Sequence, residues 1–186
     1  MARDRSRSGH TPSAEKPPKQ RPNYGLSGLL AAATNMKNGT VLKYHEPPEA
    51  KKCKGWRIYV FKDGKEIDVL ELGGQSSFLI GRDRTVADIP VDHTSCSSQH
   101  AVIQFRQVPH QNKRGEVTKV IKYKTLWEGA NMCVRPYILD LDSTNGTLLN
   151  GERVEGRRYV EIHSEDMIKF GESTREYVFI KDPSLS

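Results

Sequence analysis

The sequence lacks any apolar run of the roughly 18–20 residues that a membrane-spanning helix needs. No apolar stretch follows its first ten residues, MARDRSRSGH, so they do not resemble a secretory signal. Cysteine is scarce: Cys53, Cys96 and Cys133 form no Cys-x-x-Cys pair, which favours an intracellular protein with reduced thiols. The cysteines and histidines show no metal-ligand spacing, so we expect no metal ion and no other cofactor.

Acidic residues are rare in the first third of the chain, although the sequence as a whole is only moderately basic. Residues 1–54 contain 11 Lys or Arg against 4 Asp or Glu, a net charge of +7. The whole chain has 29 basic and 23 acidic residues, so the remainder has 18 against 19 and is close to neutral. The basic charge therefore belongs to the N-terminal segment, where RNA binding by a basic tail is one possible function.

Large apolar residues are also few in this segment, and this sets the expected domain boundaries. Residues 1–23 are rich in Arg, Ser and Pro, which predicts a disordered tail. Residues 24–54 contain a short apolar segment that could order on binding a partner, followed by an extended linker. The apolar residues of that segment are Leu26, Leu29 and Leu30. Residues 55–182 are expected to form the folded domain.

The remainder of the chain has no sustained helical periodicity. It consists of short β-rich runs separated by turn residues. Asp63-Gly64 and Asn150-Gly151 are typical of tight hairpin turns. The predicted strands are Trp56–Phe61, Phe78–Ile80, Gln99–Val108, Val117–Tyr123, Tyr137–Leu141, Arg158–Ile162, Met167–Phe170 and Glu176–Ile180. Many short strands at this spacing indicate an all-β sandwich.

Three predicted loops carry an unusual set of polar residues, each next to a predicted strand. They contain Gly81 and Arg82; Ser97, Ser98 and His100; and Thr144, Asn145 and Gly146. A guanidinium can hold a phosphate through two hydrogen bonds, and hydroxyls can donate to the remaining oxygens. Two alternatives remain open: a surface ion pair of Arg82 with Asp83 or Asp142, and a hydrolase that uses Ser97 and His100. No nucleophile elbow or oxyanion loop accompanies that pair.

The order and spacing of Gly81-Arg82, Ser97-x-x-His100 and Asn145-Gly146 resemble those of the forkhead-associated (FHA) domain. The resemblance covers residues 56–181 and implies an 11-stranded β-sandwich that binds phosphothreonine peptides without catalysis. It implies that Arg82 grips the phosphate with Ser97 and Ser98, while Asn145 and Thr144 hold the peptide beside it. It also implies that His100, Gly81 and Gly146 shape the pocket.

This resemblance extends to four further segments: the N-terminal segment, residues 41–50, DIPVDH at residues 88–93 and residues 96–102. They are similar to the FHA subunit of the pre-mRNA retention and splicing complex, the Smad nuclear-interacting protein and pre-mRNA leakage protein family. This similarity implies a nuclear splicing adaptor whose residues 24–45 bind the RNA-recognition-motif subunit of that complex, among other spliceosomal proteins. The alternative is RNA binding by the tail, with the FHA domain as a scaffold whose pocket is unused.

Overall fold

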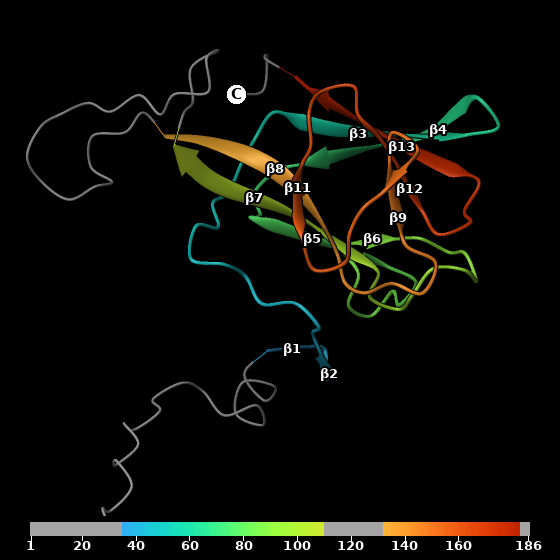
Figure 1. Cartoon of the computed structure of the whole chain (residues 1–186), viewed down its shortest axis with the longest axis horizontal. Helices are drawn as coiled ribbons and strands as arrows, with labels where there is room; N and C mark the ends of the chain where they lie inside the picture. The colour runs from blue at the N-terminus through green and yellow to red at the C-terminus, as the bar shows by residue number, and fades with distance from the viewer. Residues whose placement is uncertain (1–34, 110–131, 183–186) are drawn as a thin grey trace, which may run out of the picture.

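A computed structural model of the chain describes residues 35–109 and 132–182. All regular secondary structure in these residues is β, arranged in two sheets and a separate hairpin (Figure 1). One sheet has six strands, in the spatial order β10 (Glu152–Arg153), β9 (Thr147–Leu149), β12 (Met167–Phe170), β13 (Arg175–Lys181), β3 (Trp56–Lys62) and β4 (Lys65–Leu72). The other has five, in the order β11 (Tyr159–Glu161), β8 (Met132–Asp140), β7 (Ala101–Pro109), β5 (Ser77–Gly81) and β6 (Ile89–Pro90). The expected all-β sandwich of about 11 strands is confirmed.

The core lies between the two sheets and is built from alternate residues of their strands. In β3, Ile58 and Val60 are buried whereas their neighbours Arg57 and Tyr59 are only partly covered. This period of two is what a strand with one face against a core requires. The six-stranded sheet also buries Phe170 and Phe179, and the five-stranded sheet buries Phe105, Ile103 and Ile138 against them.

The tight turns follow the Asp-Gly and Asn-Gly pairs of the sequence. Asp63 and Gly64, between β3 and β4, have φ angles of 52° and 74°. Asn150 and Gly151, between β9 and β10, have φ angles of 51° and 86°. Two successive positive φ angles are required by the two-residue turns that match the twist of a hairpin.

Neither β4 nor β6 was among the predicted strands, and one predicted strand lies outside the described residues. β4 is an exposed edge strand whose pairing with β3 shifts between Val60 and Phe61, so its apolar residues do not alternate regularly. β6 has only two residues and pairs with β5 in parallel. The run Val117–Tyr123 falls in the part of the chain that the structure does not describe.

The packed chain begins well before Gly55, where the sequence indicated a domain boundary. Residues 35–51, which we call the strap, lie against the outer face of the five-stranded sheet. They begin with a hairpin of β1 (Met36–Lys37) and β2 (Thr40–Val41). The segment expected to be a free linker is extended, but Tyr44 is 8% exposed and packs on that sheet. The reason is that the outer face of the sheet is itself apolar.

Candidate functional site

The three polar loops come together because they follow or precede neighbouring antiparallel strands. β5 ends at Gly81, β7 begins at Ala101 and β8 ends at Asp140. In the sheet, Ile80 pairs with Ala101 and Ala101 pairs with Asp140, so all three loops leave from the same end of the strands. We call this end the loop end of the sandwich. Arg82, Ser97 and Asn145 all lie there.

Backbone hydrogen bonds join the first two loops beside Arg82. The Arg82 N–H donates to the Ser97 carbonyl at 3.0 Å, and the Asp83 N–H donates to the Ser98 carbonyl at 3.1 Å. A Cβ on Gly81 would lie 2.1 Å from the Ser98 carbonyl oxygen. Residue 81 must therefore be glycine because another backbone approaches it closely, and its φ angle does not require glycine.

The Arg82 side chain is exposed, and its Nη1 donates to the Thr94 carbonyl at 3.2 Å. Neither acidic neighbour that could have paired with it does so. The Asp142 carboxylate lies 2.7 Å from Arg157, and Asp83 accepts hydrogen bonds from the hydroxyl and the N–H of Thr85, which lower the Asp83 pKa. Within the described residues Arg82 forms no ion pair, so most of its guanidinium is available to a ligand.

The Ser97 hydroxyl, on the loop whose backbone bonds that of Arg82, retains its hydrogen for a ligand. Its Oγ accepts a hydrogen bond from the Thr144 N–H at 3.2 Å, which joins the second loop to the third. A hydroxyl can accept and donate at the same time, so the Ser97 O–H can still donate to a phosphate oxygen. The neighbouring Ser98 side chain is exposed, as is that of Thr144.

His100 is fully buried and connects two of the loops through its ring. The Ser97 N–H donates to Nδ1 at 3.1 Å, so Nδ1 is unprotonated and Nε2 donates to the Gly146 carbonyl at 3.1 Å. The ring packs edge-on against Phe170, with centroids 5.6 Å apart. Burial lowers the His100 pKa, although the bond to Gly146 acts in the opposite direction. Both ring nitrogens bond backbone, so neither serves the Ser97 hydroxyl as a base.

Asn145 bonds the second loop next to the carbonyl that Arg82 contacts. Its Nδ2 donates to the Ser95 carbonyl at 2.7 Å, and the side chain is otherwise exposed. The amide oxygen and the second amide hydrogen can therefore pair with the backbone of an extended ligand.

A comparison with protein families matches residues 78–171 to the FHA domain, the stretch that carries all three loops. The chain belongs to the FHA family. In this FHA domain the polar loops lie together at one end of the sandwich.

The chain is similar to curated FHA proteins whose names concern the nucleus and splicing. It is 45% identical over 173 residues to Smad nuclear-interacting protein 1 of Mus musculus, covering 92% of this chain and 42% of that protein. It is 31% identical over 183 residues to Pre-mRNA leakage protein 1 of Saccharomyces cerevisiae, covering 81% of this chain and 79% of that protein. The chain thus spans less than half the length of the mouse relative. The names of these relatives connect FHA proteins of this kind with the nucleus and with pre-mRNA.

The fold is also similar to that of a solved structure. The structure described as that of the yeast Pml1 splicing factor and its integration into the RES complex matches with a TM-score of 0.56 and 28% identity. The match covers 75% of this chain and 97% of the yeast chain. The FHA domain and the splicing-factor names of these relatives indicate a binding domain that is not catalytic.

The FHA site also depends on a buried carboxylate whose role the sequence did not reveal. Asp140 is 3% exposed and accepts hydrogen bonds from the Ser143 N–H, the Ser143 hydroxyl and the Thr147 hydroxyl, at 2.6–2.8 Å. These bonds hold the turn that presents Thr144 and Asn145. An Asp followed by Ser three residues later at a strand end was the only signal of this turn.

Arg153, from β10, is a second cation at the loop end that the motifs did not indicate. Gly146 has a φ angle of 80°, and a Cβ there would lie 2.8 Å from the Arg153 Nε. The guanidinium thus lies directly over the turn that carries Asn145. The φ angle of Gly146 favours glycine, whereas the Arg153 guanidinium is the end of a flexible side chain that could move aside. Among the described residues Arg153 has no acidic partner.

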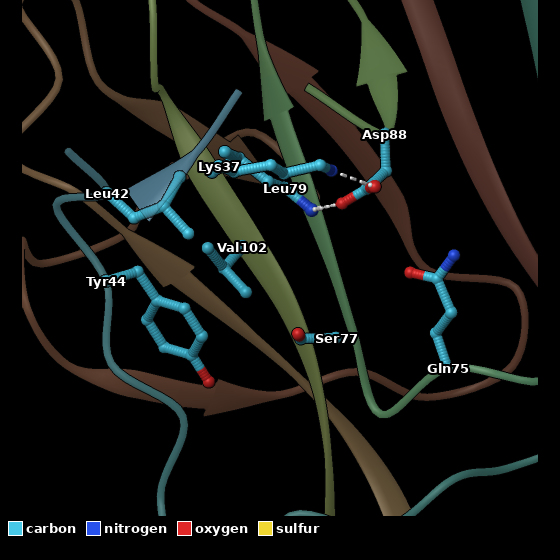
Figure 2. Close-up of a pocket in the computed structure, with 8 residues that line it drawn as sticks. All are labelled: Lys37, Leu42, Tyr44, Gln75, Ser77, Leu79, Asp88 and Val102. Atoms are coloured by element: carbon cyan, nitrogen blue, oxygen red, sulfur yellow. Dashed lines mark hydrogen bonds and ion pairs between the residues drawn. The ribbon is translucent and has the colours of Figure 1, made fainter. Parts of the chain in front are cut away.

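Other expected sites lie elsewhere or outside the described residues. Leu26, Leu29 and Leu30 belong to the part of the chain that the structure does not describe. The described residues contain no group of three metal-ligating side chains and no helix that could span a membrane. A cavity of about 170 Å³ lies under the strap and not at the loop end; Figure 2 shows its lining, which includes Leu42, Tyr44 and Val102.

Proposed function

We propose that the protein is a phosphothreonine-peptide-binding adaptor that acts in pre-mRNA splicing. The observation that carries the proposal is the Arg82 guanidinium, which forms no ion pair among the described residues, on a loop whose backbone bonds that of Ser97 at one end of an FHA sandwich. Arg82 supplies the planar donor fork that matches a phosphate, and Ser97 and Ser98 supply hydroxyl donors. Asn145 and Thr144 border the same pocket and bind the peptide backbone. His100, Gly81 and Gly146 keep the loops in place.

The phosphate contacts alone reach micromolar binding only at the upper end of their range. A hydrogen bond to a charged group contributes about 1.5–3 kcal/mol net. Arg82, Ser97 and Ser98 together then contribute roughly 4.5–9 kcal/mol, whereas a micromolar Kd corresponds to about 8 kcal/mol. Over most of this range, contacts to residues that flank the phosphothreonine supply the difference.

Isothermal titration with matched phosphorylated and unphosphorylated peptides tests this function. The peptide is selected from a degenerate library with a central phosphothreonine. We expect binding of the phosphorylated form only, and a loss of about 30-fold or more in Arg82→Ala. Arg84→Ala is the matched control, because Arg84 is exposed and its guanidinium pairs with Asp92. Equal binding of both peptide forms would contradict the proposal.

The adaptor's assembly partner is proposed from its relatives. The similar yeast splicing factor, Pml1, is described as integrated into the RES complex. By this similarity the chain is a nuclear subunit of the retention and splicing complex. Its residues 24–45 bind the RNA-recognition-motif subunit through Leu26, Leu29 and Leu30. Replacing the three leucines by alanine should abolish binding to the recombinant subunit, while Arg82→Ala should leave it intact.

A second candidate function is RNA binding by the basic tail, favoured by the charge of +7 in residues 1–54. It requires an affinity for single-stranded RNA that falls steeply with salt, because bound counterions are released on binding. Replacing the basic residues of the tail by glutamine should then abolish binding. These residues are Arg3, Arg5, Arg7, Lys16, Lys19 and Arg21. RNA binding that persists in this variant would exclude the tail as the RNA-binding element.

A further inference from the structure

The strap contacts two loops of the candidate phosphate site directly and is linked to the third through Arg157, although it ends about thirty residues before the first FHA motif. It forms its own hairpin first. Asn38 and Gly39 make the turn, with φ angles of 50° and 80°, and the Asn35 Nδ2 donates to the Leu42 and Tyr44 carbonyls at 3.0 and 2.6 Å. The strap therefore has a defined shape that it presents to the sandwich.

Apolar packing holds the strap on the outer face of the five-stranded sheet. Tyr44 packs with Val102, Leu79, Leu139 and Leu141, all of which are 7% exposed or less. Figure 2 shows the Tyr44 ring and Leu42 beside Val102. These residues alternate along their strands with the core residues, so the sheet is apolar on both faces. In Figure 1 the chain then passes from the strap to β3.

The strap is tied to the first loop, which contains Arg82. The Lys37 Nζ lies 2.6 Å from Asp88 Oδ1, and the other oxygen of that carboxylate accepts the Leu79 N–H of β5 (Figure 2). The Asn38 Nδ2 donates to the Thr85 carbonyl at 2.6 Å. Thr85 in turn bonds Asp83, the residue after Arg82.

The tie to the second loop is made by Gln99, which lies between Ser98 and His100 and is 4% exposed. Its Oε1 accepts the Lys43 N–H at 2.8 Å, and its Nε2 donates to the Val41 carbonyl at 2.9 Å. The buried amide thus pairs with the strap backbone in both directions, as a neighbouring strand would. Without the strap, both of its polar atoms would lose their partners.

The third loop is reached through Arg157. Its Nη1 donates to the Lys43 carbonyl at 2.9 Å, while its Nε lies 2.7 Å from the Asp142 carboxylate. Asp142 precedes the turn that presents Thr144 and Asn145. Gln99 and Arg157 therefore bind the N–H and the carbonyl of the same strap residue, Lys43.

We propose that the strap is a positioning element of the phosphate pocket, so that strap docking and phosphopeptide binding strengthen each other. Gln99 and Arg157 are the positioning residues. The pocket needs Arg82, Ser97 and Asn145 at fixed separations, and the strap bonds the loops of the first two and is linked to the loop of Asn145 through Arg157. Because coupling between two binding events is reciprocal, a phosphopeptide must also stabilise the docked strap. The proposal rests on the proposed phosphopeptide function for its ligand but makes a second claim about the free protein.

Two variants of the full chain release the strap from opposite sides. Gln99→Met keeps the side-chain size but removes both hydrogen bonds to the strap. Tyr44→Ala removes the ring that anchors the strap and leaves every loop residue unchanged. Each variant should weaken binding of the selected phosphothreonine peptide about fivefold or more. Glu49→Ala is the control, because Glu49 belongs to the strap but faces Arg106, away from the loops. It should stay within about twofold of the wild type.

Hydrogen exchange tests the same coupling, and its measurement on the free protein needs no ligand. In the free protein both variants should speed exchange at the amides of Arg82, Asp83 and Thr144, which bond Ser97 or Ser98. In the wild type, saturating peptide should slow exchange at the Leu42 and Lys43 amides. If the Tyr44→Ala strap exchanges freely while the three loop amides keep wild-type protection, the proposal is wrong. If no phosphothreonine peptide binds the wild type, the proposed function fails and the loop amides alone decide this inference.

Discussion

The arginines of the sandwich form two groups that differ in what they contact. In one group the guanidinium forms an ion pair: Arg57 lies 2.8 Å from Asp182, Arg135 lies 2.8 Å from Glu161, and Arg158 lies 3.0 Å from Glu155. In the other group, at the loop end, Arg82 contacts a neutral carbonyl and Arg153 lies over the Gly146 backbone. An ion pair at a surface satisfies the charge already, whereas an unpaired guanidinium keeps its donors for a ligand. This difference distinguishes Arg82 and Arg153 from the ion-paired arginines of a domain that is nearly neutral.

The acidic residues at the loop end also differ in what they contact, and this gives the largest expected effect. Asp140 is buried at the loop end and accepts three hydrogen bonds, whereas Asp142, two residues later, is exposed and pairs with the exposed Arg157. Asp140→Ala should lower the free energy of unfolding by about 3 kcal/mol, because it leaves Ser143 and Thr147 without their buried acceptor. Asp142→Ala should lower it by less than about 1 kcal/mol.

Urea denaturation of the two variants measures this difference. Equal losses of stability for Asp140→Ala and Asp142→Ala would show that the loop end is not built on the buried carboxylate. The Asp142 variant is also the matched control for changes in net charge.

A titratable group at the loop end gives the next effect. His100 is buried and neutral, and burial lowers its pKa below the usual value near 6.5 that it regains on unfolding. The unfolded chain therefore binds the proton more readily than the folded one. The stability from the neutral ring is complete above pH about 6.5 and is lost as the pH falls below it, with a slope of up to about 1.4 kcal/mol per pH unit.

Thermal unfolding between pH 5 and 8, about the range in which histidine titrates, tests whether stability falls as the pH falls. His163→Gln is the control, because His163 is an exposed histidine on the side of the sandwich. The wild type and the control should lose stability in parallel below pH about 6.5. A stability that rises on acidification would contradict the neutral, doubly bonded ring.

Much of this site could be predicted from the sequence, because its residues lie directly at strand ends. Short β-rich runs between turn residues located β5, β7 and β8. Because these strands are antiparallel neighbours, their loops bring Arg82, Ser97 and Asn145 to one end of the sheet. What escaped prediction depends on contacts between residues far apart in the chain. The Gly81 requirement comes from the Ser98 backbone, and the role of Gln99 comes from a strap 56 residues away. No local pattern encodes either contact.

The strap shows the same limit in its apolar residues. The sequence predicted an extended linker here, but that prediction does not distinguish a free linker from a docked one. Tyr44 packs on Val102 and Leu79 because these residues point away from the core, and their direction depends on strand register. β4 escaped for a related reason, since the shift at Val60 and Phe61 disrupts its period.

Arg153 gives the smallest expected effect and the most direct test of the difference between the two groups of arginines. If an unpaired guanidinium at the loop end marks the binding surface, Arg153→Ala should weaken binding of the selected phosphothreonine peptide by about two- to fivefold, as the loss of one exposed charge contact would. Its thermal stability should not change. Arg158→Ala is the control, because Arg158 is also exposed but already pairs with Glu155.

Titration of both variants at low and high salt completes the test, since a peptide contact of Arg153 must weaken as salt screens it. If both variants bind as the wild type does, the guanidinium over Gly146 only supports the turn, and the ligand contacts lie on the Arg82 side of Asn145.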